Sequence, residues 1–365
     1  MKSLFPNRAL VAAIVVSFTL SVFAVSSAQS SKRSSVNVHL VTDEAEAVLA
    51  ILAKRKAKLP ITETDWQRLF SSEGYTRLNK REVEIRKIVK TATPFNEEVF
   101  KAFVLSDELL SRAPALDDTL LKWKQADVDA ATRRALVYLP KDAQIRAKIY
   151  PVVKPRTNSF VFELRSDPAI FLYLNPDVSR EQFENTLAHE LHHVGYGSGC
   201  PPKRTSDEIA KLPKNSQTVI ELIGAFGEGF AILAAAGGTD VHAHAVDSAE
   251  DRLRWDKDMA NFNDDLKKIE RFFLDILENR LTEEKIQETA SSFFGGQGAW
   301  YTVGWKMSVV IEKTYGRAKL IECICDQRKL LPTYNRAAAK NNRRAREPLA
   351  LWSVSVMNGI GQRKS

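Results

Sequence analysis

The chain of 365 residues is predicted to have an α+β fold that is predominantly helical, with one small sheet. Apolar residues recur at helical spacing over most of the chain. Short runs rich in β-branched and aromatic residues occur in one part only, between residues 135 and 174. The composition, 44% hydrophobic and 27% charged, is ordinary for a globular protein and argues against both disorder and a multi-pass membrane protein.

The first 28 residues are predicted to be a signal peptide. Lys2 and Arg8 give a positive start, residues 10–25 are almost entirely apolar, and Ser26-Ser27-Ala28 offers small residues for cleavage. The alternative is an uncleaved membrane anchor, because the apolar run is long for a signal peptide. The body of the protein is therefore expected in the periplasm or secreted, without stable membrane insertion once the leader is cleaved.

Residues 29–130 are expected to form an N-terminal helical region after a short polar start. Pro94 and Pro114 are expected to separate its helices, since proline interrupts a helix interior. The expected helices cover residues 41–57, a segment capped by Thr62 and Asp65, and residues 78–91.

From Arg134 onward the sequence contains short runs rich in β-branched and aromatic residues, and a small sheet is predicted there. Its strands are expected at residues 135–139, 147–153, 160–164 and 170–174, each bounded by Pro, Asn or Asp. The segment 171–175 is a candidate edge strand that could pair with an extended peptide.

The segment TLAHELHHVGYG, residues 186–197, is predicted to be a helix. Ser179 and Gln182 form a capping box before it, and Gly195 and Gly197 are expected to end it. Its apolar stripe consists of Phe183, Leu187, Leu191 and Val194.

This helix contains His189-Glu190-Leu191-His192-His193, which matches H-E-x-x-H. Side chains at i and i+4 share one helix face, so His189 and His193 can both reach one zinc ion. Glu190 then lies beside the ion, where it can take a proton from an attacking water. We therefore predict two zinc ligands and a general base. His192 points off this face and is expected behind the ligands or at the surface.

A helix predicted at residues 216–236, closed by Gly237-Gly238, is expected to supply the third ligand. Glu221 and Glu228 are seven residues apart and share one face. A carboxylate in so apolar a helix is expensive to bury without a partner, and zinc would be that partner. Glu228 is the predicted ligand and Glu221 the alternative, unless both are paired with arginine or face solvent. The internal glycines that would permit close approach of a helix or metal site are Gly224, Gly227 and Gly229.

Two further segments hold candidate catalytic groups. His242 and His244 follow in a loop, where either could donate a proton, stabilise an oxyanion, or lie at the surface. Tyr301 stands at the glycine- and aromatic-rich start of a helix expected to run to Tyr315, with Gly316 as its cap. Its hydroxyl could reach a tetrahedral intermediate, or the ring could anchor the loop to the core.

The remaining segments show amphipathic patterns typical of packed helices and, near the C-terminus, a basic cluster. Residues 247–281 are amphipathic, and residues 131–335 are taken as the zinc peptidase core. Residues 336–365 form a basic C-terminal tail, with residues 349–356 as a closing helix. Its basic cluster lacks interleaved aromatic residues, which favours a solvated helix face over nucleic-acid binding.

The three cysteines are Cys200, Cys323 and Cys325. An exported protein can hold a disulfide, and Cys200 could pair with either of the others. A Cys-Ile-Cys metal site would lack a partner pair at zinc-finger spacing.

Together, HELHH and the later GEGFA (residues 227–231) resemble the gluzincin metallopeptidases. Residues 38–334 also resemble a bacterial family of zinc-dependent peptidases. The resemblance depends on these two motifs together with DVHAH and WYTVGWKM. The resemblance implies a thermolysin-like core with one zinc ion, held by His189, His193 and Glu228, with Glu190 as base and Tyr301 near the substrate. Ile232 replaces the acidic residue of the thermolysin pattern, so His242 or Asp240 is expected to orient the histidines.

The sequence therefore predicts an exported zinc-dependent metallopeptidase that acts on a peptide or protein. The alternatives are a zinc-binding module without turnover, or a metal-dependent amidohydrolase of a non-peptide substrate. The presence of Glu190 argues against the module, because a structural zinc site needs no base.

Overall fold

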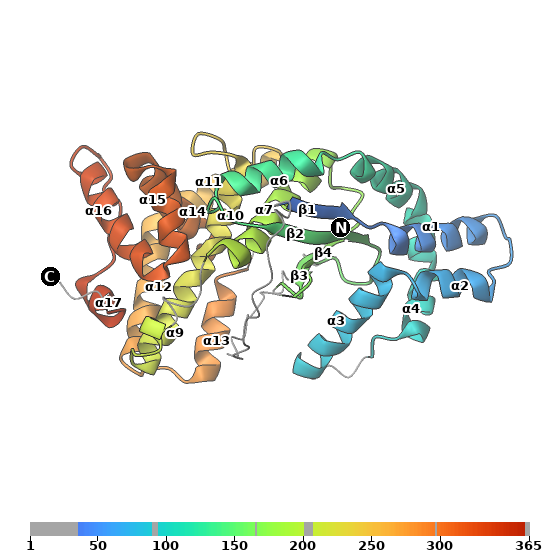
Figure 1. Cartoon of the computed structure of the whole chain (residues 1–365), viewed down its shortest axis with the longest axis horizontal. Helices are drawn as coiled ribbons and strands as arrows, with labels where there is room; N and C mark the ends of the chain where they lie inside the picture. The colour runs from blue at the N-terminus through green and yellow to red at the C-terminus, as the bar shows by residue number, and fades with distance from the viewer. Residues whose placement is uncertain (1–35, 90–93, 165, 201–206, 296–297, 362–365) are drawn as a thin grey trace, which may run out of the picture. The chain divides into compact units, whose positions relative to one another are not determined.

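The computed structural model describes residues 36–361, except 90–93, 165, 201–206 and 296–297 (Figure 1). The predicted signal peptide lies outside the described residues. The described chain is predominantly helical with one four-stranded sheet, which confirms the predicted fold class. It forms two compact units, and two segments of the chain contribute to each. Of the described residues, the first unit comprises those up to Val128 and Ile145–Glu184, and the second comprises Asp129–Gln144 and those from Asn185 onward.

The sheet belongs to the first unit and has the strand order β1-β2-β4-β3 (Figure 1). Strands β1 (Val36–Leu40), β2 (Ile145–Val152) and β4 (Ala169–Tyr173) run parallel, and β3 (Phe160–Phe162) pairs antiparallel with β4. Every residue of β4 is buried, as is usual for a central strand of a parallel sheet.

Three strand predictions were wrong. Residues 38–40, predicted to belong to the N-terminal helical region, instead form part of β1, a short strand of alternating burial that pairs with β2. Residues 135–137 end helix α6 (Val128–Val137) instead of forming a strand. Ala131, Ala135 and Tyr138 are buried at helical spacing, so packing overrides the β propensity of this run. Strand β4 has a partner on both sides and is therefore not the edge expected at residues 171–175.

Five helices complete the first unit. Helix α1 lies against α2, α3, α5 and β2. The Asp43 carboxylate accepts hydrogen bonds from the backbone N–H groups of Glu73 and Gly74, which fixes the start of α3 beside α1. The helices are α1 (Asp43–Lys56), α2 (Glu63–Phe70), α3 (Glu73–Val89), α4 (Glu97–Val104) and α5 (Asp107–Lys124).

The starts and breaks predicted for the helices of this unit were mostly correct. The capping box of Thr62 and Asp65 starts α2 as predicted. Pro114 does not separate two helices but lies inside α5. A proline in a helix interior costs about 3 kcal/mol. The buried stripe of α5, which includes Leu116, Leu120 and Trp123, offsets that cost by packing.

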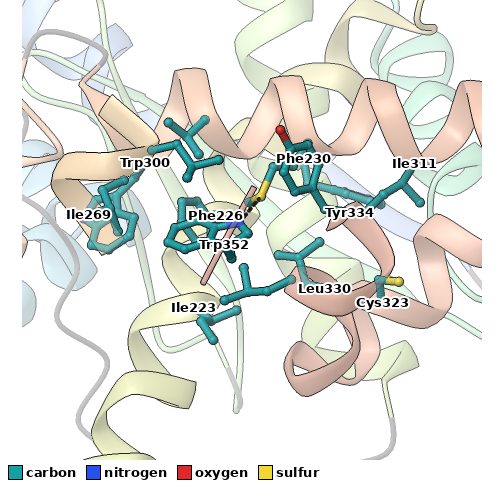
Figure 2. Packing of buried hydrophobic residues seen from close by; sticks show 14 of the residues in the cluster. Ile223, Phe226, Phe230, Ile269, Trp300, Ile311, Cys323, Leu330, Tyr334 and Trp352 are labelled. Atoms are coloured by element: carbon teal, nitrogen blue, oxygen red, sulfur yellow. Dashed lines mark hydrogen bonds between the residues drawn. The ribbon is translucent and has the colours of Figure 1, made fainter. Parts of the chain in front are cut away.

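The second unit is helical and is built around α14. This helix contacts α10, α12, α15 and α16. Phe226, Trp300 and Trp352 form the aromatic centre of its core (Figure 2), with ring centroids 5.0 Å apart for Phe226 and Trp300. Beyond α6 and α7 (Arg180–Gly199), the helices are α9 (Lys214–Ile223), α10 (Gly227–Ala236), α11 (Ala249–Ala260), α12 (Phe262–Leu277), α13 (Glu283–Ser292), α14 (Ala299–Tyr315), α15 (Arg317–Cys325), α16 (Leu330–Asn342) and α17 (Val354–Gly359).

The predicted helix at residues 216–236 begins at Lys214 and contains a 3₁₀ turn, Gly224–Phe226, between α9 and α10. Gly237 ends α10 with a φ of 87°, as predicted, because glycine adopts this left-handed conformation readily. The run Lys214–Ala236 is long and apolar enough to cross a membrane by length and composition. Most of it is buried inside this unit, which indicates a core helix instead.

Helix α7 starts at the predicted capping box, in which Ser179 and Gln182 exchange side-chain-to-backbone hydrogen bonds. It does not end at Gly195 or Gly197 but continues to Gly199. Neither glycine adopts a positive φ, so neither supplies the left-handed turn that would stop the helix.

The end of the chain differs from the predicted closing helix, since residues 350–353 have no regular structure and α17 begins only at Val354. Asparagine side chains of α16 replace the helical hydrogen bonds there. Asn342 bonds both backbone groups of Leu349, and Asn335 does the same for Trp352. These amides hold the tail along α16 and place Trp352 in the core.

Candidate metal centre

Two histidines of α7 and a glutamate of α10 converge in the second unit. The Nε2 atoms of His189 and His193 lie 3.1 Å apart. The Glu228 Oε2 atom is 3.2 Å from Nε2 of His189 and 3.4 Å from Nε2 of His193. Among the described residues, this is the only group of three or more His, Cys, Asp or Glu side chains placed to hold one metal ion.

These spacings fit a zinc ion. Zinc binds imidazole nitrogen at about 2.0–2.1 Å in a tetrahedral arrangement, which requires neighbouring ligand atoms about 3.3 Å apart. The observed distances of 3.1, 3.2 and 3.4 Å lie on both sides of that value. Two imidazoles and one carboxylate are also a ligand set that zinc commonly takes at catalytic sites. The three residues could therefore hold zinc with little movement.

Glu221, the alternative third ligand, does not join the group. It lies exposed on α9. Glu228, one helix later, has about a quarter of its side chain exposed and faces both imidazoles. Glu228, preferred to Glu221 because its helix is so apolar, is thus the glutamate that lies with the two histidines.

The electrostatics of the three residues show that the site favours a positive charge. Burial alone would raise the pKa of Glu228, but His193 and His189 outweigh it and hold that pKa well below its usual range. Burial likewise opposes protonation of His193, yet the Glu228 carboxylate raises the pKa of His193 to about 9. A positive charge between these groups is therefore stabilised by their arrangement.

Glu190, the predicted base, follows His189 on α7. Burial raises its pKa, and the negative charge of Glu228 adds to this, while His189 and His193 act in the opposite direction. The charges of all three converging residues therefore act on the carboxyl group of Glu190. A carboxylate with a raised pKa is a better proton acceptor near neutral pH.

His192 is buried, with 1% of its surface exposed, and so is not a surface residue. Its ring lies 5.0 Å from the ring of Phe230, in the interface between α7 and α10. Burial first, and then the charges of His193 and His189, lower its pKa to about 3. His192 is therefore a neutral packing residue that helps to join the two ligand-bearing helices.

Tyr301, in the first turn of α14, reaches the site from a third helix. Its backbone carbonyl lies next to Gly229, the residue that follows Glu228. Burial, and then the charges of Glu228 and Glu190, raise the pKa of Tyr301. The phenol therefore stays protonated and can act as a donor at any ordinary pH.

The glycines of the α9–α10 run differ in what they contact. A Cβ on Gly229 would meet backbone atoms of Tyr301 and Trp305 at 2.3 and 2.1 Å, so this glycine permits the close approach of α14. Gly224 meets the side chain of Gln327, and Gly227 has nothing within 4 Å. The predicted close approach of another helix is thus confirmed at Gly229 alone. The sequence reasoning overlooked its counterpart, Gly304, although a glycine inside the apolar helix of WYTVGWKM is the same signal.

The histidines of the DVHAH loop bond elsewhere. His242 faces Asp256 at 3.1 Å, and the buried His244 faces Asp247 at 2.6 Å. Asp240, the other candidate for orienting the zinc ligands, pairs with Lys313. Among the hydrogen bonds and ion pairs of the described residues, none joins His242 or Asp240 to the ligand histidines. The loop nevertheless lies near Tyr301, because Ala243 packs in a small cluster with Ile232 and Trp255 against which Tyr301 rests.

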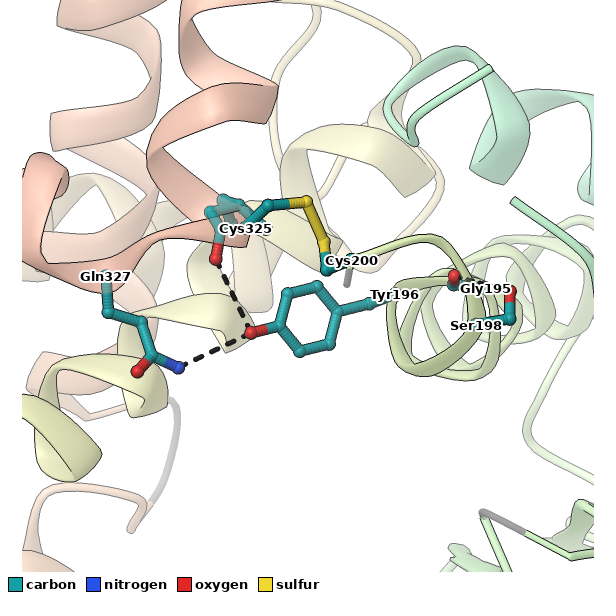
Figure 3. Close-up of a disulfide and its surroundings, with 7 residues drawn as sticks. Gly195, Tyr196, Ser198, Cys200, Cys325 and Gln327 are labelled. Atoms are coloured by element: carbon teal, nitrogen blue, oxygen red, sulfur yellow. Dashed lines mark hydrogen bonds between the residues drawn. A yellow bond between two sulfur atoms is a disulfide. The ribbon is translucent and has the colours of Figure 1, made fainter. Parts of the chain in front are cut away.

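The far end of α7 is fixed by a disulfide between Cys200 and Cys325 (Figure 3). This pairing resolves the alternatives left open by the sequence, and Cys323 remains a buried free thiol. Beside the disulfide, the Tyr196 hydroxyl donates to the carbonyl of Ile324 and accepts from the amide of Gln327. The end of the helix that carries both histidines is therefore held to the C-terminal end of α15.

Comparison with known proteins adds one finding. Neither the curated proteins nor the solved structures contain a significant match to this chain. The model of one family, described as "Putative zinc dependent peptidase (DUF5700)", matches residues 62–343, a span that includes His189, His193 and Glu228. Since this match covers more than half of the chain, the protein belongs to that family.

Proposed function

We propose that the protein is a zinc-dependent metallopeptidase that hydrolyses peptide bonds by attack of water. One observation supports this most strongly. Three ligand atoms from two helices lie at zinc-compatible distances, and Glu190, which does not belong to the ligand set, directly follows the ligand His189 on α7. A site that only stabilised the fold would need no such carboxylate.

The residues take the following roles in this proposal. His189, His193 and Glu228 hold one zinc ion, which when bound polarises the scissile carbonyl and makes the attacking water more acidic. Glu190 accepts the proton of that water and later donates it to the leaving amine. Tyr301 and His242 are the candidates to stabilise the oxyanion. Two histidines on one helix and a glutamate on a following helix support a thermolysin-like arrangement of the core.

We also propose that the enzyme works outside the cytoplasm, in the periplasm or secreted. The sequence of the first 28 residues supports export, and the Cys200–Cys325 disulfide supports an oxidising compartment. The substrate in this proposal is a peptide or protein, without nucleic-acid binding. N-terminal sequencing of the protein recovered from its host tests the leader, and a mature chain that still contains residues 1–28 would contradict cleavage.

The catalytic proposal is tested by incubating a mixed peptide library with the purified wild-type protein and with Glu190→Gln. The substitution removes the base and keeps the shape, so cleavage should fall by about a hundredfold or more while zinc content stays unchanged. Glu181→Gln, an exposed glutamate at the start of the same helix, is the matched control and should cleave like wild type. Equal cleavage by wild type and Glu190→Gln would remove the catalytic claim. A zinc-loaded protein that cleaves non-peptide amides but no peptide would favour the amidohydrolase alternative.

A further inference from the structure

The second unit carries a basic segment around α16 that the proposed hydrolysis does not use. Within residues 327–346, every charged side chain is a lysine or an arginine. Arg328 and Lys329, at the start of this segment, pair with neighbouring glutamates and aspartate. Three later cations take part in no ion pair among the described residues, namely Lys340, Arg343 and Arg344. Positive charge is therefore left uncompensated at the C-terminal end of α16.

These three cations line one surface hollow of about 500 Å³, together with Asn341 and Ala345. None of the five lining residues is acidic. Sites for small molecules typically have volumes of about 300–1,000 Å³, so the hollow is large enough for a ligand. Arginine offers a planar fork of N–H donors that matches the oxygens of phosphate or carboxylate, and lysine adds a compact positive charge. The hollow therefore favours a ligand rich in negatively charged oxygen.

The turn that carries the two arginines is closed at its base by an asparagine. The Asn342 side chain donates to the carbonyl of Leu349 and accepts from its N–H, at 2.9 and 2.8 Å. Asn263 of α12 holds the adjoining backbone in the same way. Residues 343–348 thus begin and end at fixed points. Less conformational entropy is lost on binding when the groups that contact a ligand are already held in place.

Lys340 is held by an aromatic ring from another helix. Its ammonium lies 4.4 Å from the ring centroid of Tyr315, the last residue of α14. Lys340 also lies in the last turn of α16, where the negative end of the helix dipole stabilises a cation. That effect does not account for Arg343 and Arg344, because both follow Asn342, the last residue of the helix.

We infer that the hollow at the end of α16 is a binding site for phosphate groups, in which Arg343 and Arg344 pair with phosphate oxygens and Lys340 supplies further positive charge. A phosphate monoester carries about −1.5 to −2 at pH 7, so two closely spaced phosphates balance three cations. A single carboxylate would leave most of that charge uncompensated. Closely spaced phosphates occur on soluble diphosphates and on the surface of an anionic phospholipid membrane. The inference depends neither on zinc binding nor on peptide hydrolysis.

Pyrophosphate binding to the purified protein, measured by isothermal titration calorimetry, tests the site. The double variant Arg343→Gln/Arg344→Gln should bind at least about tenfold more weakly, because hydrogen bonds between charged groups are the strong ones. Both arginines are exposed, so the variant should fold like wild type. Pyrophosphate also binds zinc, but that part of the signal is common to wild type and variant and does not contribute to the difference.

Two further double variants separate a specific site from general charge attraction. Lys211→Gln/Lys257→Gln removes two exposed cations elsewhere in the same unit, which lowers the net charge equally, and it should bind pyrophosphate like wild type. Arg343→Lys/Arg344→Lys keeps the charge but removes the planar forks, and should bind severalfold more weakly than wild type. Wild-type affinity in this lysine variant would overturn the assigned pairing of the arginines with phosphate.

Vesicles distinguish the two sources of phosphate. Sedimentation with phosphatidylglycerol vesicles that is lost in Arg343→Gln/Arg344→Gln, without sedimentation with phosphatidylcholine, would support the site and assign it to a membrane surface. Pyrophosphate binding without vesicle binding would support it and assign it to a soluble ligand. Equal binding of both probes by wild type and Arg343→Gln/Arg344→Gln, or binding of neither probe by wild type, would overturn the inference. Polyglutamate bound as tightly as pyrophosphate would also overturn it, because the site would then not select phosphate.

Discussion

Two glutamates, one in each unit, show how different the surroundings of a partly or fully buried carboxylate can be. Glu44 and Glu228 both lie in the first turn of a helix, α1 and α10 respectively. Glu44 is 1% exposed, accepts one hydrogen bond from the backbone N–H of Val153, and has a second oxygen without a partner. Glu228 keeps about a quarter of its side chain exposed and faces two imidazoles.

The pKa values of these glutamates move in opposite directions for a physical reason. Burial, opposed only in part by the Val153 hydrogen bond, raises the pKa of Glu44 to about 8. The two histidines hold the pKa of Glu228 well below its usual range. Burial of a carboxylate is therefore no evidence for a metal ligand. Convergence with other ligands and access from solvent distinguish Glu228 from Glu44.

The largest expected difference between these glutamates is in zinc binding. Glu228→Ala removes one of three protein ligands and should weaken zinc binding on the order of a thousandfold, given the roughly 10–16 kcal/mol typical of a complete site. Glu44→Ala and the exposed Glu221→Ala should leave the affinity unchanged. Isothermal titration of the metal-free proteins with zinc measures all three. Wild-type affinity in Glu228→Ala would show that the comparison rests on the wrong ligand.

The second difference is in the pH dependence of stability. The pKa of Glu44 is about 8 in the folded protein and about 4.5 when unfolded. The stability that the neutral carboxyl supplies is therefore full below about pH 4.5 and is lost as the pH rises through about 8. Glu44→Gln stays neutral, so its unfolding free energy should exceed that of wild type by an amount that grows over this range, to a maximum on the order of 4 kcal/mol.

Hydrogen exchange of the β2 amides at several pH values reports this difference for the first unit alone. Lys154, whose pKa burial lowers to about 7, has the opposite pH dependence: its contribution is full at high pH and is lost as the pH falls through about 7. Each of the two groups shifts the pKa of the other, so the difference between the two proteins reports Glu44 together with its effect on Lys154. Parallel pH profiles for wild type and Glu44→Gln would refute the buried neutral carboxyl.

The smallest expected difference concerns the glycine beside each glutamate. A Cβ on Gly74 would meet the Glu44 Cβ at 2.8 Å and the Asp43 Oδ1 at 3.0 Å. Overpacking costs about 1–3 kcal/mol, and the better helix propensity of alanine returns about 1 kcal/mol. Gly74→Ala should thus destabilise the first unit by about 1 kcal/mol, measured by hydrogen exchange of α3, with no change in zinc affinity. Weaker zinc binding in Gly74→Ala would contradict a zinc site formed by residues of the second unit alone.

The parts of the fold and site that sequence predicted are those encoded within a few residues. The capping boxes at Thr62 and Ser179, the terminal glycines Gly237 and Gly316, and the spacing of His189 and His193 are local patterns with a direct physical meaning. Glu228 was predicted as a ligand because burying a carboxylate in so apolar a helix is costly without a partner, and it lies together with both histidines.

The errors arose where distant segments decide the outcome. Strand β1 is stable only through its pairing with β2, which lies more than 100 residues later. Asparagines of α16 hold the tail at residues 349–352 out of a helix. The contact of Gly229 with α14 likewise depends on how two helices pack and could not be derived from spacing.

The most direct test of the central claim is X-ray absorption spectroscopy at the zinc edge of the purified protein. The structure predicts one zinc per chain with two imidazole nitrogens and carboxylate oxygen at about 2.0–2.2 Å, together with one further light atom from solvent. The imidazole signal should fall by half in His193→Ala and persist in full in Glu221→Ala. A zinc ion bound by sulfur, or surrounded by oxygen alone, would contradict a site formed by His189, His193 and Glu228.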